Sequence, residues 1–208
     1  MLDGMHGTRP TLAALITVLA LALTGCAARM TPPYSDAERA RVDEYERAAE
    51  RVLTSREIAG RPPSVQVGSD PALINAGHPA AYYQRRTALA GIGRPGAIVV
   101  NRPVLAEDYI AQAVLSHELA HFVLGHTDDR CRDRQHECEV EAYVASVELL
   151  MTGWGHSYPD AVRLQYAYLK SVVLAVQRGD ATVARGHVDP CRELQEFSAR
   201  FQTTASCD

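Results

Sequence analysis

The sequence is poor in aromatic residues and has no excess of positive charge. Only 6% of its 208 residues are aromatic, with one Trp and three Phe. The 21 Lys and Arg are outnumbered by 25 Asp and Glu, which gives a net charge of −4. Because nucleic-acid surfaces need clustered basic residues to neutralise phosphates, this balance argues against a nucleic-acid partner. The composition, 47% hydrophobic and 22% charged, is that of an ordinary globular domain rather than a disordered chain.

A hydrophobic run long enough to cross a membrane is also missing. The apolar run at residues 11–23 has about 13 residues, whereas a bilayer core needs about 20. Arg9 precedes the run and Leu23-Thr24-Gly25-Cys26 follows it, a pattern typical of a signal peptide. The small residues before the Cys resemble the bacterial lipobox. That resemblance implies cleavage before Cys26 and lipidation of this residue.

This interpretation divides the chain into three parts. We expect a lipoprotein signal peptide at residues 1–25, a tether at 26–34 and a single domain at 35–208. Acyl chains on the new N-terminus would anchor the protein to a membrane of the cell envelope. Because residue 27 is Ala rather than Asp, the resemblance implies that in a Gram-negative cell the protein would be sorted to the outer membrane, facing the periplasm; the sequence does not reveal the envelope type. The alternative is an ordinary signal peptide followed by an accidental Cys.

The sequence has no C-x-x-C pair, which disfavours a zinc site built from cysteines. With Cys26 assigned to the lipid, four cysteines remain in a protein predicted to be exported, so we expect two disulfides. They are Cys131, Cys138, Cys191 and Cys207. Three connectivities are possible. The local one, which joins Cys131 to Cys138 and Cys191 to Cys207, requires the least prior folding and is favoured.

Hydrophobic periodicity predicts more helix than strand. Helices are expected at residues 35–58, 107–124, 137–151, 159–177 and 190–201, and short strands at 65–67, 82–83, 87–92 and 97–101. Ser35 and Glu38 have the spacing of a capping box. Gly125, Gly153 and Gly179 each follow a predicted helix, where glycine is a common terminator. The predicted fold class is therefore α+β, mostly helical, with a small sheet.

One short motif, within the helix predicted at residues 107–124, carries specific chemistry. Residues 117–121 have the pattern H-E-x-x-H. Residues four apart lie on one helix face, so His117 and His121 can reach a single Zn²⁺. Glu118 beside them can act as a general base toward water at the metal. A purely structural helix has little reason to carry these three polar groups among apolar neighbours, because unpaired polar burial is costly.

A catalytic zinc site also needs a third protein ligand and an open position. Glu137, Glu139 and Glu141 alternate in the next predicted helix, and their helical spacing prevents all three from facing one metal. One face of that helix holds Glu139, Ala142, Tyr143, Ser146 and Leu150. The small residues on this face would permit close packing against the helix that carries the histidines.

The segment HELAHFVLGH, followed 18 residues after its second His by E-x-x-A, resembles the gluzincin metallopeptidases. The closest likenesses are the CAAX-protease-like periplasmic and lipoprotein peptidases and the ImmA/IrrE-type peptidases. The resemblance covers residues 95–153 and implies a minimal zincin-like fold. It assigns Glu118 as general base and three metal ligands, His117, His121 and Glu139, with Glu141 as the alternative third ligand.

The resemblance carries two further expectations. Ala97–Asn101 resembles the edge strand that binds substrate backbone in such enzymes. Where these families have Asp or Asn after E-x-x-A, this chain has Tyr143, which can hydrogen-bond a histidine or stabilise the transition-state oxyanion. Weaker candidates for the oxyanion donor are His156, Tyr158 and His187.

His126 calls for a separate interpretation. It follows the second His of the motif by five residues, whereas the metzincin pattern places a third His ligand six residues after it. The central Gly of that pattern is also missing. We therefore expect His126 to lie beyond the helix in a structural role.

The expected function is that of a membrane-anchored zinc metalloendopeptidase that hydrolyses peptide bonds in envelope proteins. The alternative is a zinc-containing lipoprotein that acts as a non-catalytic binding or chaperone-like assembly factor. Glu118 favours the enzyme, because a structural zinc site needs no base beside it. Hydrolysis of another target by the same chemistry, such as a cell-wall amide, is a third possibility.

Overall fold

The computed structural model describes residues 34–68, 81–84, 96–126, 128–179, 187 and 189–207. Residues 34–208 form one compact unit. The predicted signal peptide, the lipidation site Cys26, the tether up to residue 33 and the strand expected at 87–92 lie outside the described residues. Among the described helices, none combines the length and apolar character that a membrane span requires.

Helix α2 (Asp36–Ser55) begins as its sequence predicts. The Ser35 hydroxyl accepts a hydrogen bond from the Glu38 N–H, and the Glu38 carboxylate accepts one from the Ser35 N–H, which confirms the capping box. The apolar side of the helix is buried and its charged side is exposed. Tyr45, at the centre of the buried side, donates a hydrogen bond to the Pro63 carbonyl and so fixes the chain that leads into the sheet.

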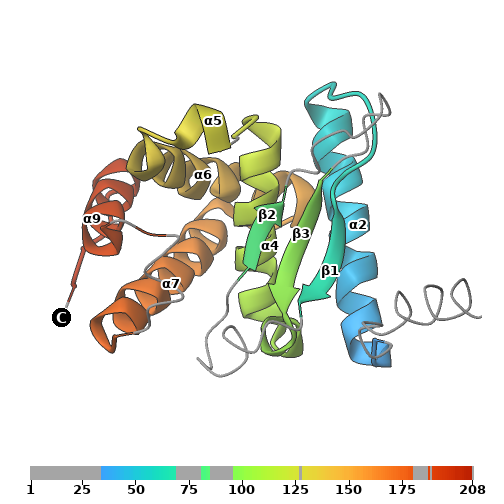
Figure 1. The fold of residues 1–208 in the computed structure, drawn as a ribbon, viewed down its shortest axis with the longest axis horizontal. Coiled ribbons are helices and arrows are strands. Elements are labelled where there is room, and N and C mark those ends of the chain that lie inside the picture. Colours follow the sequence, from blue (N-terminus) through green and yellow to red (C-terminus); the bar gives the residue numbers. More distant parts are fainter. Residues whose placement is uncertain are drawn as a thin grey trace, which may run out of the picture. The chain divides into compact units, whose positions relative to one another are not determined.

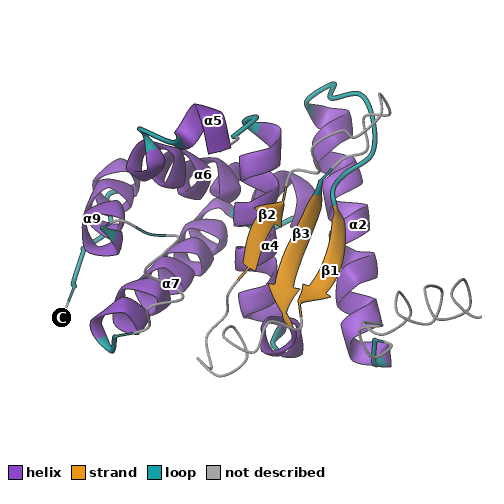
Figure 2. Cartoon of the chain, viewed as in Figure 1, coloured by secondary structure: helices purple, strands orange, loops and turns teal. Residues whose placement is uncertain are grey.

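The sheet has three strands, β1 (Ser64–Gly68), β2 (Ala81–Gln84) and β3 (Ala97–Asn101), in the order β1-β3-β2 (Figure 2). β1 runs parallel to β3 and β2 runs antiparallel to it. The expectation that residues 97–101 form an edge strand is therefore wrong, because β3 lies between the other two. Its residues 97–100 are buried on both faces, as the unbroken apolar run Ala-Ile-Val-Val requires in a central strand.

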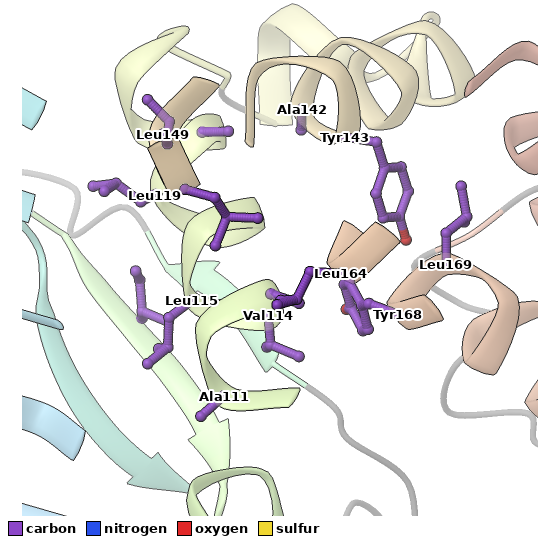
Figure 3. Close-up of a cluster of buried hydrophobic side chains, with 14 of the residues drawn as sticks. Ala111, Val114, Leu115, Leu119, Ala142, Tyr143, Leu149, Leu164, Tyr168 and Leu169 are labelled. Carbon is purple, nitrogen blue, oxygen red and sulfur yellow. The ribbon is translucent and has the colours of Figure 1, made fainter. Parts of the chain in front are cut away.

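Helix α4 (Asp108–Val123) carries the H-E-x-x-H motif and follows β3 after a short 3-10 helix, η1 (Arg102–Ala106). It packs on the sheet on one side and on helices α6 and α7 on the other (Figure 1). Its buried residues therefore lie all around the helix rather than along one stripe. Apolar side chains before and within the motif anchor it in the core, among them Ala111, Val114, Leu115 and Leu119 (Figure 3).

The segment after α4 contains more helix than predicted. A single turn, α5 (Asp128–Cys131), lies in the stretch expected to be a loop, and α6 (Gln135–Leu149) continues into a π-helical turn, η2 (Leu150–Trp154). The helical run ends at Gly155, with a positive φ of 78°, and not at Gly153. Gly153 instead permits close packing, because a Cβ atom there would lie 3.1 Å from the Ala48 carbonyl oxygen of α2.

Helices α7 (Tyr158–Gln177) and α9 (Pro190–Phe201) complete the unit, capped by Ser157 and Asp189. The structure joins Cys131 to Cys138 and Cys191 to Cys207, which agrees with the pairing favoured from the sequence. At the level of fold class, the mostly helical α+β architecture with a small sheet is confirmed.

Candidate metal centre

Two neighbouring helices bring three potential metal ligands together. His117 and His121 lie one turn apart on the side of α4 that faces α6, and Glu139 projects from the first half of α6. The Nε2 atoms of the two histidines are 3.1 Å apart, and the Glu139 Oε2 atom lies 3.1 Å from His117 Nε2 and 3.6 Å from His121 Nε2. These three atoms converge on one point, so the residues could hold a metal ion.

The side chains of these three residues are largely buried. The side chain of His117 is 2% exposed, and those of His121 and Glu139 are each 13% exposed. Burial lowers the pKa of His117 to about 4. Burial opposes ionisation of Glu139, but the charge of His121 and hydrogen bonds with His117 and His121 hold its pKa well below the usual range. Burial lowers the pKa of His121, but the charge of Glu139 and the hydrogen bond to it outweigh this effect and raise it. Because metals bind neutral imidazole and ionised carboxylate, a metal ion would displace a proton from His121.

Glu118 and two tyrosines line the same interior. Glu118 is 5% exposed, and its charge acts on His121, Tyr143 and Tyr168. The Tyr143 ring stacks on the His117 ring with 4.2 Å between centroids, and its side chain is directed toward α7, where Tyr168 lies (Figure 3). Burial raises the pKa of both hydroxyls well above their usual value, so both tyrosines remain protonated at neutral pH.

Two buried polar atoms at this centre have no hydrogen-bond partner among the described residues. They are the Tyr143 hydroxyl oxygen and His117 Nδ1. Buried polar atoms normally have a partner in the protein or in ordered water. The Tyr143 ring restrains His117 by packing, and its hydroxyl is a buried donor without a partner among the described residues.

His187 reaches the centre from the segment between α7 and α9. Its Nδ1 atom lies 3.8 Å from Glu139 Oε2 and 3.0 Å from Oε2 of Glu193, a fully buried residue of α9. Burial lowers the pKa of His187, but the hydrogen bond to Glu193 and the charge of Glu139 outweigh this effect and raise it. The sequence named His187 only as one of several weak candidates and missed Glu193. The sequence did contain a signal for Glu193, because this carboxylate lies on a mostly apolar face of its helix, next to Leu194.

His126 lies against His121, and Glu141 lies against His126. The two Nδ1 atoms of His126 and His121 are 3.0 Å apart, and His126 Nε2 lies 3.1 Å from Glu141 Oε2. Glu141, the alternative third ligand from the sequence, is therefore next to His126, while Glu139 is next to the histidines of the motif. His126 also lies near Cys131 and Cys138, but these sulfurs are joined in a disulfide.

Two other predicted candidates have different partners. His156 Nε2 lies 2.7 Å from the Gln112 amide oxygen, which links the start of α7 to α4. Tyr158 is half exposed and packs against Phe201 of α9. Neither contact involves the three converging side chains.

Comparison of the chain with protein-family models, curated proteins and solved structures gives no match. The interpretation of the centre therefore depends on its own residues and geometry.

Proposed function

We propose that this protein is a zinc-dependent hydrolase that cleaves peptide bonds, anchored to a cell-envelope membrane by a lipid on Cys26. The observation that carries the proposal is the convergence of His117, His121 and Glu139 beside a buried Glu118. Two imidazoles and one carboxylate with a further position left for substrate are the donor set of catalytic zinc sites. The proposed membrane attachment rests on Leu23-Thr24-Gly25-Cys26 alone.

The spacing of the three ligand atoms supports Zn²⁺. Ligand atoms about 2.0–2.2 Å from a tetrahedral ion lie about 3.3–3.6 Å from one another. The three separations here are 3.1, 3.1 and 3.6 Å, so one lies within this range and two are about 0.2 Å shorter. As ordinary hydrogen bonds the two 3.1 Å contacts compete, because the single proton that a neutral His117 carries on Nε2 cannot be donated to both His121 and Glu139.

The residues around the centre supply the remaining chemistry of amide hydrolysis. A Zn²⁺ ion at such a site polarises a carbonyl and makes water more reactive near neutral pH. Glu118 takes a proton from a water molecule as the water oxygen forms a bond to the carbonyl carbon. It then gives the proton to the amide nitrogen as the C–N bond breaks. Candidate donors to negative charge on the carbonyl oxygen are the Tyr143 hydroxyl and His187, which would use Nε2 because its Nδ1 atom lies 3.0 Å from Glu193 Oε2.

The sheet offers an edge for an extended substrate, although not at the strand first expected. Among the described residues, β2 pairs on one side only, with β3, and it packs against α4. A peptide that pairs with the free edge of β2 would add a fourth strand beside the helix that carries the motif. This arrangement favours an unfolded or extended polypeptide as the substrate.

Zinc content and hydrolysis, measured together, test the proposal. The full-length protein is purified from membranes as wild type, Glu118→Gln, Glu139→Gln and the control Glu137→Gln, an exposed residue of the same helix. We expect about one zinc per chain in all but Glu139→Gln, which removes a ligand. Cleavage of an unfolded protein substrate should survive only in wild type and Glu137→Gln.

Two results would contradict the proposal in different ways. Zinc in every variant without cleavage in any would indicate a non-catalytic binding or assembly factor. Cleavage by Glu118→Gln at the wild-type rate would remove Glu118 as the base.

A further inference from the structure

We propose that His126 and Glu141 are positioning residues of the metal site and act through His121. The inference rests on the metal site of the proposed function but not on peptide hydrolysis. It would give this chain a continuous line of contacts from a partly exposed carboxylate to a metal ligand. In that line Glu141 is hydrogen-bonded to His126, and His126 is hydrogen-bonded to His121.

The end of α4 explains why His126 lies beside His121. Gly125 has a positive φ of 66°, the Gly125 N–H donates to the Phe122 carbonyl, and the His126 N–H donates to the His121 carbonyl over 2.8 Å. These two bonds define a Schellman cap, in which the second residue after the cap packs on the residue three positions from the helix end. An apolar pair usually makes that contact. Here the pair consists of two histidines, whose Nδ1 atoms are 3.0 Å apart.

The tautomers of the two histidines are fixed by this line. If His121 binds metal through Nε2, its proton is on Nδ1, which must then donate to an acceptor. His126 Nδ1 is the acceptor within reach, so the His126 proton is on Nε2. That nitrogen lies 3.1 Å from the Glu141 carboxylate, which accepts the second hydrogen bond. Each donor thus meets one acceptor, and the His121 ring is held in the orientation that directs Nε2 toward Glu139.

The surroundings of His126 indicate that this arrangement is built into the fold. His126 is only 4% exposed, and both of its ring nitrogens have partners. The second carboxylate oxygen of Glu141 lies 3.2 Å from the Arg134 guanidinium, which restrains its position. A buried histidine with a purely structural role would need only hydrogen-bonding partners. It would not need one that is a metal-ligand candidate.

Metal binding by the metal-free full-length protein tests the inference, with Co²⁺ as a visible probe and Zn²⁺ measured by competition. The variants are His126→Ala, His126→Asn and Glu141→Ala. Glu148→Ala, which removes a carboxylate of the same helix paired with Arg56, is the matched control. Asn retains an acceptor where His126 Nδ1 lies but loses the link to Glu141.

We expect His126→Ala to weaken binding of both metals about 10- to 100-fold, the range typical of such supporting residues, and to change the Co²⁺ absorption spectrum. His126→Asn should restore much of the affinity, Glu141→Ala should weaken it less than His126→Ala, and Glu148→Ala should leave it at the wild-type value. Circular dichroism of the metal-free variants verifies that each is folded.

Wild-type affinity and spectrum in folded His126→Ala would overturn the inference and leave the hydrolase proposal standing. Conversely, the expected series of affinities in a protein that cleaves no peptide would support the inference while the hydrolase proposal fails. Equal losses in His126→Asn and His126→Ala would also overturn it, because the acceptor at Nδ1 would then have no role.

Discussion

The two disulfides lie in two regions of the protein and can be compared by what each of them holds in place. Cys131–Cys138 spans seven residues, joins α5 to the first turn of α6 and ends one residue before Glu139. Cys191–Cys207 spans 16 residues and ties the C-terminal tail to the start of α9. The first region holds potential metal ligands, whereas the second holds a chain end against α7. The comparison suggests that one disulfide positions a site and the other stabilises the fold.

The double variant Cys191→Ser/Cys207→Ser should have the largest effect on stability. Closing a loop of this length in the unfolded chain corresponds to about 3 kcal/mol, and the variant loses that contribution. Urea denaturation of the metal-free protein measures the loss. Zinc affinity should remain that of the wild type, and a tenfold weaker affinity would show that the C-terminal region also shapes the site.

The double variant Cys131→Ser/Cys138→Ser should lose less stability but affect the metal. Its shorter loop corresponds to about 2 kcal/mol in the metal-free protein. Because Cys138 precedes Glu139 and both sulfurs lie near His126, we expect zinc to bind more weakly as well. Zinc titration of both double variants makes the comparison direct. Unchanged zinc affinity in Cys131→Ser/Cys138→Ser would show that this disulfide has no positioning role.

The same contrast between local and distant interactions explains what the sequence could predict about the fold. The capping box of α2 follows from residues three apart, and its amphipathic face from helical spacing, so both were predictable. The position of β3 in the sheet depends on pairing with β1, whose residues precede their partners in β3 by 33 positions, and it was predicted wrongly. The helical run of α6 and η2 continues past Gly153, where a tertiary contact with α2, and no local pattern, accounts for the glycine.

The candidate site divides in a similar way. The proximity of His117 and His121 follows from a spacing of four residues within one helix, so the motif sufficed to predict it. The choice of Glu139 over Glu141 depends on how α6 packs on α4, and in the sequence it was indicated by the family resemblance and by the small residues that share a helix face with Glu139. The contact of His126 with His121 was predictable in principle, because Gly125 at the helix end favours a Schellman cap. His187 and Glu193 are only six residues apart, but the position of His187 beside Glu139 depends on tertiary packing that no local pattern indicates.

Hydrogen bonds to the C-terminal tail sharpen the account of Cys191–Cys207. Tyr166 of α7 donates to the Thr204 carbonyl over 3.1 Å, and Lys170 and Gln177 donate to the Ser206 and Cys207 carbonyls. Tyr166→Phe should reduce the free energy of unfolding by about 0.5 kcal/mol, the low end for a hydrogen bond, because this one is exposed. In the Cys191→Ser/Cys207→Ser background the same change should cost nothing if the disulfide holds the tail in place. A double-mutant cycle by urea denaturation measures this coupling, and simple additivity would show that the tail docks without the bond.

The smallest predicted effect concerns the link between the two regions, where His136 Nε2 of α6 lies 3.0 Å from Glu196 Oε1 of α9. The hydrogen bond from His136 holds the pKa of Glu196 below its usual range. A lowered folded-state pKa contributes stability above the unfolded-state value of about 4.3, and this contribution is lost as the pH falls through the folded-state pKa. Because the Glu196 side chain is 40% exposed, we expect this contribution to the free energy of unfolding to be less than about 1 kcal/mol.

The pH dependence of stability in the metal-free protein tests this contribution. Glu196→Gln should lose stability less steeply than wild type below about pH 4.3. Glu50→Gln, an exposed control on α2, should follow wild type. Identical pH profiles for Glu196→Gln and wild type would mean that the two regions are joined by packing alone, without a contribution from this charge.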